Sequence, residues 1–249
     1  MSTKCRSIWI SDIHLGTKGC QADELIKFLS EYECDYLYLV GDIIDGWRMR
    51  NGTTYWPQTH TNVLRKFLGK AKHGTQVVYV SGNHDEFLRP FVREFDLRMG
   101  NLTITDEAFH KTIDGRNLLV IHGDKYDTIV KYHKWIAFLG DSAYTFSLWA
   151  NRIFNGIRKK FGLPYWSLSS FLKHKVKHAQ FFIEEFEEAL AHEGRERKVD
   201  GIICGHIHHA EIRQIQDIMY YNSGDWVESC TALIEDYHGN ITVKKWLDR

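Results

Sequence analysis

Polar side chains that could hold metal ions follow directly after apolar segments at five places along the chain. They are Asp12, His14, Asp42, Asn83, His84, His122, His206 and His208. This mixture of carboxylate, amide and imidazole groups, without a thiolate, suits manganese, iron, cobalt or zinc better than calcium or magnesium. Because the donors outnumber those that one ion takes, the sequence predicts two ions with a single carboxylate between them.

Each of these residues also has an ordinary structural interpretation when it is taken alone. Asp42 and Asp45 could cap a turn or a helix, and Asp85 could cap a short helix that follows it. His206 and His208 could be partly buried histidines, although a spacing of two keeps both side chains on one face of a strand. A turn at the strand end would bring them together equally well. The recurrence of the pattern after five segments favours the metal site.

The apolar segments that precede these groups are rich in β-branched and aromatic residues, which is typical of buried strands. They are residues 7–10, 36–40, 75–80, 117–121 and 199–204. In open α/β sheets, ligands bind at the carboxyl ends of the strands, which is where the polar groups lie. Gly82 lets the chain turn sharply after the third segment. The sequence therefore predicts an α/β fold whose strand ends assemble the site.

Helices are predicted between the first strands, and more strands are predicted after the last histidine motif. Leu25, Ile26 and Leu29 share one helix face, and a second helix begins near Pro57 and ends at Gly74. Residues 210–215, 219–221, 231–234 and 241–246 alternate or cluster like antiparallel strands. This order of elements is that of a single α/β domain.

The segment from about residue 125 to about residue 196 differs in character from the rest of the chain. It has no convincing strand, and Ile183, Phe186 and Leu190 recur on one face of a long predicted helix. Residues 151–178 contain seven lysines and arginines and no acidic residue, with aromatic residues between them. We expect one domain over residues 1–249, in which this segment is a helical cap over the active edge.

The composition narrows the class of protein. The 249 residues include 32 lysines and arginines and 32 aspartates and glutamates, so the net charge gives no reason to expect nucleic-acid binding. Five scattered cysteines without a C-x-x-C motif indicate a reducing compartment. Strand residues follow Met1 closely, which leaves no room for a signal peptide, and no apolar run approaches the roughly 20 residues of a membrane span. We therefore expect a cytoplasmic protein.

The complete series of motifs resembles that of the calcineurin-like metallophosphoesterases, whose pattern is D-x-H, G-D, G-N-H-D/E, H and G-H-x-H. The match extends from about Ser7 to His208 in the correct order. Within that superfamily the chain is similar to the UDP-2,3-diacylglucosamine diphosphatase group of Gram-negative lipid A synthesis. Residues 11–15, residues 122–124 and the helical insertion carry this similarity. One departure is His84, because the best-known members of the group have arginine there.

The resemblance implies a layered α/β/β/α sandwich with a helical cap and a dinuclear metal site. Two ions, most often Mn²⁺ and otherwise iron, zinc or cobalt, would share a carboxylate and activate a water between them. The implied ligands of one ion are Asp12, His14, Asp42 and His208, and those of the other are Asp42, Asn83, His122 and His206.

The resemblance also implies roles for residues around the ions. His84 would neutralise the phosphoryl oxygens or protonate the departing group, and Asp85 would orient His84. The basic and aromatic cap would receive a lipid chain and its phosphate, or rest on the inner membrane; a solvated face and an internal core are the alternative interpretation. The candidate substrate contacts are Asn83, Arg152, Arg158, Lys173 and Lys177.

The function that follows is hydrolysis of a pyrophosphate or phosphoester bond by attack of a metal-activated hydroxide. The expected substrate is UDP-2,3-diacylglucosamine or a similar nucleotide-linked lipid, which gives a cytoplasmic enzyme in peripheral contact with the inner membrane. Two alternatives are open: a general soluble phosphodiesterase or phosphomonoesterase acting on nucleotides, and a metal-binding scaffold without catalysis. The sequence predicts neither the oligomeric state nor the acyl chains.

Overall fold

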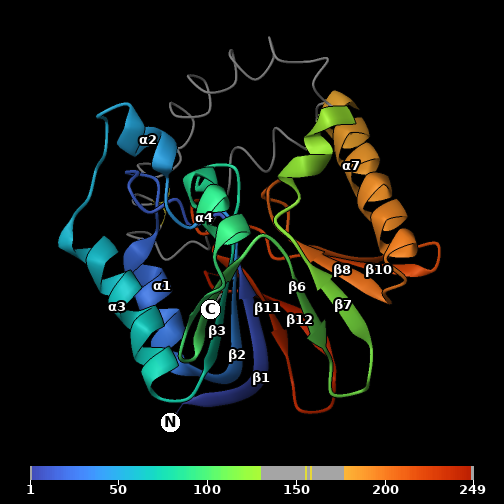
Figure 1. Cartoon of the computed structure of the whole chain (residues 1–249), viewed down its shortest axis with the longest axis horizontal. Helices are drawn as coiled ribbons and strands as arrows, with labels where there is room; N and C mark the ends of the chain where they lie inside the picture. The colour runs from blue at the N-terminus through green and yellow to red at the C-terminus, as the bar shows by residue number, and fades with distance from the viewer. Residues whose placement is uncertain (1, 130–154, 156–157, 159–176, 248–249) are drawn as a thin grey trace.

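The computed structural model describes residues 2–129, 155, 158 and 177–247. Within these residues, two β-sheets pack face to face, and helices cover the outer face of each sheet (Figure 1). The layers follow the order helix, sheet, sheet, helix. The predicted α/β/β/α sandwich is confirmed.

The first sheet contains seven strands in the order β12-β11-β1-β2-β3-β5-β4. They are β1 (Thr3–Ile10), β2 (Tyr32–Val40), β3 (Gln76–Val80), β4 (Leu97–Met99), β5 (Leu102–Thr105), β11 (Thr231–Glu235) and β12 (Ile241–Lys245). β1, β2, β3 and β5 are parallel, whereas β11, β12 and β4 run antiparallel to their neighbours. The carboxyl ends of β1, β2 and β3 therefore lie side by side at one edge.

The second sheet contains five strands in the order β6-β7-β8-β10-β9. They are β6 (Ala108–Lys111), β7 (Asn117–Val120), β8 (Gly201–Cys204), β9 (Glu211–Ile215) and β10 (Ile218–Asn222). β7, β8 and β10 are parallel, and the outer strands β6 and β9 are antiparallel to them. The carboxyl ends of β7 and β8 are thus also adjacent.

Three long helices form the outer layers. α1 (Ala22–Glu31) and α3 (Gln58–Lys72) pack together against the first sheet, and α7 (Lys177–Glu196) packs against the second sheet (Figure 1). The connecting loops contain the short elements α2 (Gly46–Arg50), η1 (Glu86–Leu88), α4 (Arg89–Glu94) and η2 (Asp124–Ile129). Among the described residues, none of the helices combines the length and the apolar character that crossing a bilayer requires.

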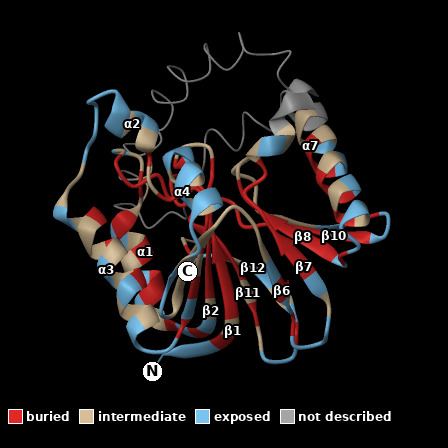
Figure 2. Cartoon of the chain, viewed as in Figure 1, coloured by how far each residue is buried: buried red, intermediate tan, exposed pale blue. Residues whose placement is uncertain are grey.

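Buried apolar side chains fill each space between the layers (Figure 2). Adjacent residues of β1 serve two of these cores, because successive side chains of a strand point to opposite faces. Ile8 packs with Phe28 of α1, and Trp9 packs with Ile203 of the second sheet. Phe186 belongs to the third core, beneath α7. Both sheets are therefore fixed relative to each other by apolar contact, which holds their carboxyl edges together.

The segment predicted as a cap, residues 125–196, is described in the structure only in part. Its last 20 residues form α7, where Phe186 and Leu190 pack against Leu119 and Ile202 of the second sheet. This helix is the outer layer of the sandwich and belongs to the core of the domain. Residues 130–154, 156–157 and 159–176 lie outside the described residues, so the cap over the active edge stays a prediction.

Candidate metal centre

The predicted ligands come together where the carboxyl edges of the two sheets meet. The first sheet delivers its ligands from the loops after β1, β2 and β3, and the second sheet delivers its ligands after β7 and β8. Their donor atoms form compact groups in which every atom lies within 4.8 Å of the others. We call Asp12, His14 and His208 the first group, and we call Asp42, His122 and His206 the second group.

The backbone at these positions is unusual. Five of the candidate ligands have a left-handed conformation, namely Asp12 (φ 52°), His14 (φ 52°), Asp42 (φ 54°), His206 (φ 70°) and His208 (φ 53°). Such strain persists only where the surrounding structure holds it, and it concentrates at functional sites. Backbone hydrogen bonds hold it here, because the amide of Asp12 donates to Gly41 O (3.1 Å) and the amide of His14 donates to Asp42 O (2.9 Å).

In the first group, the side chains of β1 and β8 meet across the two sheets. Nε2 of His208 lies 3.1 Å from Oδ1 of Asp12, and the rings of His14 and His208 are 5.5 Å apart between centroids. Oδ2 of Asp12 also accepts a hydrogen bond from the backbone amide of His206 (2.9 Å). One carboxylate oxygen thus fixes the loop after β8, while the other faces the histidines.

In the second group, Asp42 occupies the position of a shared ligand. Oδ1 of Asp42 lies 3.3 Å from Nε2 of His122, and Oδ2 lies 3.8 Å from Nε2 of His14 in the first group. The ring of His122 is oriented by its Nδ1, which lies 2.9 Å from Val40 O, and its centroid is 5.0 Å from that of His206. The two oxygens of Asp42 therefore face the two groups.

Several buried oxygen and nitrogen atoms that could bind a metal form no hydrogen bond with any described residue. They are Oδ1 of Asp12, Oδ1 of Asn83 and Nε2 of His122. Buried polar atoms are almost always satisfied, so atoms of this kind need an unseen partner. Oxygen and imidazole nitrogen donors that converge in this way fit two divalent cations, and the set contains no thiolate.

The carboxylates and imidazoles change each other's proton affinity. Burial opposes ionisation of Asp12, yet His208 lowers the pKa of the Asp12 carboxyl to about 2. Burial likewise opposes protonation of His122, yet the Asp42 carboxylate raises the pKa of His122 to about 10. A cation that binds His122 must displace this proton, so metal binding here releases protons.

Two motif glycines leave room for the ligands. A Cβ atom on Gly41 would collide with the ring of His122, and a Cβ atom on Gly82 would collide with the carboxylate of Asp42. Gly41 also has a positive φ of 76°, which side chains disfavour. These glycines are therefore required by close approach of the backbone to the second group.

His84 lies beside the cage, between two carboxylates. Its Nδ1 is 3.3 Å from Oδ2 of Asp45, and its Nε2 is 3.9 Å from Oδ2 of Asp42. The ring of Trp47 packs against it, with centroids 4.0 Å apart, and the His84 side chain is 22% exposed. Asp45 also lies 3.6 Å from Nδ1 of His14. This places an imidazole with solvent access at the mouth of the metal centre.

The carboxylate beside His84 is Asp45, which corrects the expectation that Asp85 orients this histidine. Asp85 is fully buried and accepts hydrogen bonds from the amide of Ile43 (2.9 Å) and the hydroxyl of Tyr79 (2.6 Å). Its carboxylate thus ties together the loops after β2 and β3. Asp45 combines two roles, since it also caps α2 by accepting from the amide of Arg48 (2.9 Å). The spacing G-D-x-x-D is the sequence signal that could have identified it.

Of the five predicted substrate contacts, two lie outside the described residues and three lie within them. Arg152 and Lys173 lie outside them. Arg158 is half-buried, and Lys177 is the first residue of α7. Asn83 lies between Gly82 and His84, which both approach Asp42, and its Oδ1 is buried without a hydrogen-bond partner among the described residues. Phosphate contacts by the four basic residues stay predictions.

Comparison with known proteins agrees with this arrangement. The family model of the calcineurin-like phosphoesterases matches residues 6–210. A UDP-2,3-diacylglucosamine hydrolase of Shewanella loihica is 23% identical over 240 residues, which cover 91% of each chain. A UDP-2,3-diacylglucosamine hydrolase of Chromohalobacter salexigens is 32% identical over 127 residues, 49% of this chain and 48% of that one. Among solved structures, Vacuolar Protein Sorting 29 from Cryptosporidium parvum is 11% identical with a TM-score of 0.47, covering 96% of this chain and 94% of its own.

The matched residues make up most of the chain and contain every motif that delivers a candidate ligand. The order of the motifs, the four-layer fold and the convergence of the donors all agree with the match. The chain therefore belongs to the calcineurin-like phosphoesterase family and is a phosphoester hydrolase.

Proposed function

We propose that the protein uses two divalent cations, preferably Mn²⁺, to hydrolyse the pyrophosphate of UDP-2,3-diacylglucosamine or a similar nucleotide-linked lipid. The products would be UMP and a lipid phosphate. The observation that carries the proposal is the cage in which Asp42 faces both the first and the second group. The choice of lipid is supported by the Shewanella relative, which is named for that substrate and covers 91% of both chains.

The two groups and one amide account for the coordination of both cations. The proposed ligands are Asp12, His14 and His208 for one cation and Asn83, His122 and His206 for the other, with Asp42 between them. A bound pair of this kind lowers the pKa of a coordinated water and neutralises charge on the phosphoryl oxygens.

His84 would act on the departing oxygen from the open side of the cage. A positively charged imidazole there can donate its proton to the leaving group or neutralise a phosphoryl oxygen. Asp45, 3.3 Å from Nδ1, would orient the ring and leave Nε2 to face the substrate. Trp47 restricts the ring on its other face.

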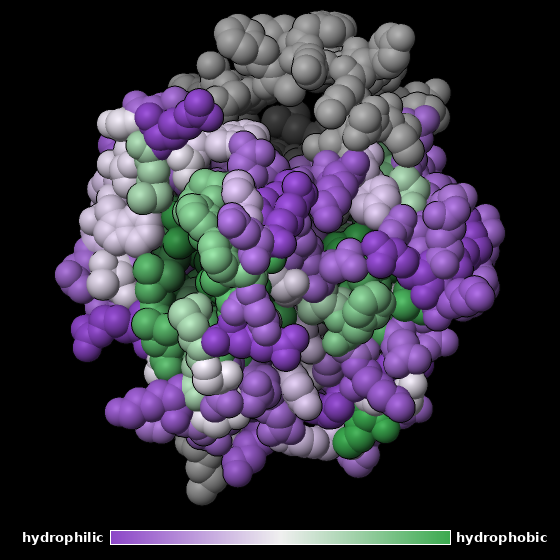
Figure 3. Space-filling model, in the orientation of Figure 1, coloured by the Kyte–Doolittle hydropathy of each residue, from purple (hydrophilic) through white to green (hydrophobic). Residues whose placement is uncertain are grey.

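An apolar surface beside the centre supports a lipid rather than a free nucleotide as substrate. Trp47 and Phe87 are 44% and 45% exposed, and Phe91 of α4 and Phe95 directly after it are 54% and 53% exposed. Figure 3 shows apolar residues gathered over α4 and between it and α3. Exposed apolar areas of this kind commonly bind apolar partners. The proposal therefore includes a cytoplasmic enzyme that meets its substrate at the inner membrane.

The test compares the lipid with small phosphoesters. With Mn²⁺ bound, the protein should release UMP from UDP-2,3-diacylglucosamine with a kcat/KM well above that for UDP-glucose or a bis-aryl phosphate. Asp42→Ala should abolish turnover, while Asp217→Ala, at an aspartate whose side chain is 70% exposed, should not. Equal efficiency on UDP-glucose and the lipid would refute the lipid assignment. Absence of turnover on all three substrates by metal-loaded protein would refute the enzyme.

A further inference from the structure

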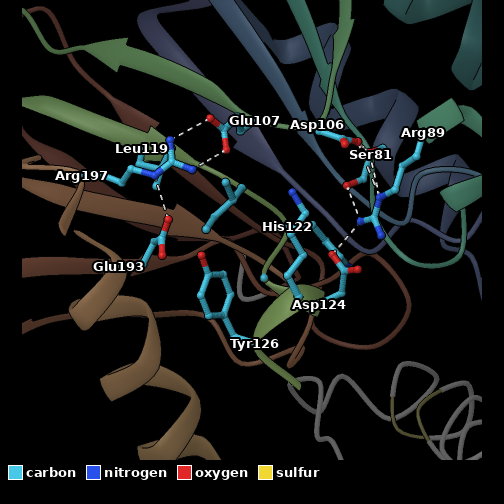
Figure 4. Close-up of a pocket in the computed structure, with 13 residues that line it drawn as sticks. Ser81, Arg89, Asp106, Glu107, Leu119, His122, Asp124, Tyr126, Glu193 and Arg197 are labelled. Carbon is cyan, nitrogen blue, oxygen red and sulfur yellow. Dashed lines mark hydrogen bonds and ion pairs between the residues drawn. The ribbon is translucent and has the colours of Figure 1, made fainter. Parts of the chain in front are cut away.

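A cavity of about 60 Å³ lies beside His122, between the edges of the two sheets (Figure 4). Its lining includes two arginines, and each of them is paired with carboxylates. Arg197 of the chain after α7 contacts Glu107 (3.1 Å) and Glu193 (2.9 Å). Arg89 contacts acidic residues on the opposite wall. Since the charge of both arginines is already neutralised, the cavity is a junction between loops rather than an anion site.

The guanidinium of Arg89 is the centre of this junction. Arg89 is the first residue of α4, and its side chain, only 15% exposed, turns back toward the strand ends. It donates to the carbonyl and the hydroxyl oxygen of Ser81 (both 3.3 Å) and to Oδ1 of Asp124 (2.8 Å). It also lies 3.6 Å from Asp106, in the connection between β5 and β6. One side chain therefore contacts the loop after β3 of the first sheet, the loop after β7 of the second sheet and the connection that joins the two sheets.

Two of those connections carry proposed ligands of the same cation. Ser81 lies two residues before Asn83, in the loop after β3 of the first sheet. Asp124 lies two residues after His122, in the loop after β7 of the second sheet. Asn83 and His122 thus come from different sheets, and the planar fork of Arg89 links their loops with directional hydrogen bonds.

We infer that Arg89 is a positioning residue for the cation held by Asn83 and His122, because it fixes the separation of the two loops that carry them. The inference rests on the proposed function, since it requires two bound cations. Metal coordination tolerates only small errors in ligand position, and hydrogen bonds around the ligands set that position. The first group depends on the loops after β1 and β8, which Arg89 does not contact.

This arrangement predicts an asymmetric effect of removing the guanidinium. His122 keeps its hydrogen bond to Val40 O, so its ring stays oriented while its loop becomes free to shift. The cation of the second group should therefore bind about tenfold more weakly in Arg89→Met. This is the smallest loss of metal affinity that is typical when a residue that supports the metal ligands through hydrogen bonds is replaced. The cation of the first group should keep its affinity.

Arg93 provides a matched control on the same helix. It also contacts Asp106, at 3.2 Å, but its side chain is 67% exposed. Metal-free wild type, Arg89→Met, Arg89→Lys and Arg93→Met would be titrated with Mn²⁺ by calorimetry, with free Mn²⁺ counted by electron paramagnetic resonance. We expect two ions in every case. The affinity for one of them should fall about tenfold in Arg89→Met, fall less in Arg89→Lys and stay unchanged in Arg93→Met. At saturating Mn²⁺, Arg89→Met should regain kcat with an unchanged KM.

Other outcomes would overturn the inference. Equal weakening of both ions in Arg89→Met would indicate a general structural role, and unchanged affinities would indicate no role. A wild type that binds fewer than two ions would overturn both this inference and the proposed function, whereas the first two results leave the proposed function standing. Circular dichroism would check the fold of each variant. Asp124→Asn, which weakens only the far end of the link, gives the same test should Arg89→Met not fold.

Discussion

Replacing Asp45 by asparagine tests the coupling between this carboxylate and His84. Asparagine keeps an oxygen that can accept the capping hydrogen bond from the amide of Arg48, but it removes the charge beside the imidazole. Despite burial, contacts with His14 and His84 hold the pKa of the Asp45 carboxyl well below its usual value. The group is therefore ionised at neutral pH, and the substitution removes a full negative charge.

The separation of the two groups sets the magnitude of the effect. Two unit charges 3.3 Å apart attract by about 5 kcal/mol at an effective dielectric constant of about 20. Because the His84 side chain is 22% exposed, water reduces this further, and we take about 2–3 kcal/mol. At about 1.4 kcal/mol per factor of ten, Asp45→Asn should lower a rate that needs the charged imidazole by roughly 30- to 100-fold.

The assay compares a phosphodiester that has a good aryl leaving group with one that has a poor alkyl leaving group. Proton donation matters most for the poor leaving group, so the loss of kcat should be larger for the alkyl ester. A loss of equal size on both esters would mean that His84 neutralises phosphoryl charge. A kcat within twofold of wild type on the alkyl ester would refute the coupling between Asp45 and His84.

Asp85→Asn provides the contrasting variant. Both carboxylate oxygens of Asp85 accept hydrogen bonds, one from the amide of Ile43 and the hydroxyl of Tyr79 and the other from the amide of Gly82, so the NH₂ group of asparagine would face a donor in either orientation. The free energy of unfolding should fall by about 1–3 kcal/mol, the cost of an unsatisfied buried donor. Identical unfolding of Asp85→Asn and wild type would contradict the structural role of Asp85.

Three further outcomes are expected. Gly82→Ala should abolish Mn²⁺ binding by the second group, because its Cβ would collide with the Asp42 carboxylate; calorimetry that found two ions at wild-type affinity would contradict this. Burial raises the pKa of Glu187 to about 7, although Arg213 lies 3.0 Å away. This pKa exceeds the usual value of 4.5, so protonated Glu187 stabilises the fold fully below about pH 4.5. The stabilisation is lost as the pH rises through 7. Glu187→Gln should therefore gain stability over wild type between pH 5.5 and pH 8 in urea unfolding, by at most about 3 kcal/mol; a pH-independent difference would contradict the assignment. Chelation of the metal should abolish turnover and lower the thermal midpoint, and added Mn²⁺ should restore both with a midpoint that rises with its concentration; turnover that survives chelation would contradict a metal-dependent reaction.

The central strands could be predicted because their sequence is apolar on both faces. Ile8 and Trp9 are adjacent, and each is buried in a different core, so the segment reads as a continuous apolar run. The polar residues that follow these strands lie at one edge because the carboxyl ends of parallel strands meet there. Order and spacing thus indicated the candidate ligands, and the resemblance to the phosphoesterases divided them between two ions.

Other elements gave no comparable signal. The strand β4 is three residues long, and Phe91 and Phe95 near α4 are exposed, so neither alternation nor a buried face marks them. The periodicity of Phe186 and Leu190 identified a helix, but their partners Leu119 and Ile202 come from distant strands. The position of this helix, α7, in an outer layer therefore depends on tertiary packing.

The neighbours of His84 illustrate the same limit at the site. Asp85 is adjacent to it in the chain, yet the backbone directs that carboxylate to Ile43 and Tyr79. Asp45 arrives from the loop after β2. Sequence adjacency does not determine which carboxylate faces a ring, because the turn after β3 points successive side chains in different directions.

The left-handed backbone at five of the candidate ligands limits how this centre could be re-engineered. Aspartate, asparagine and histidine enter that conformation more readily than other residues that have a side chain. Exchanging His14 for cysteine or Asp42 for glutamate, to change the preferred metal, would therefore add a conformational cost of about 1–2 kcal/mol to the change of donor. The residues that suit these cations are also those that tolerate the required chain direction, which leaves a short list of workable substitutes at each position.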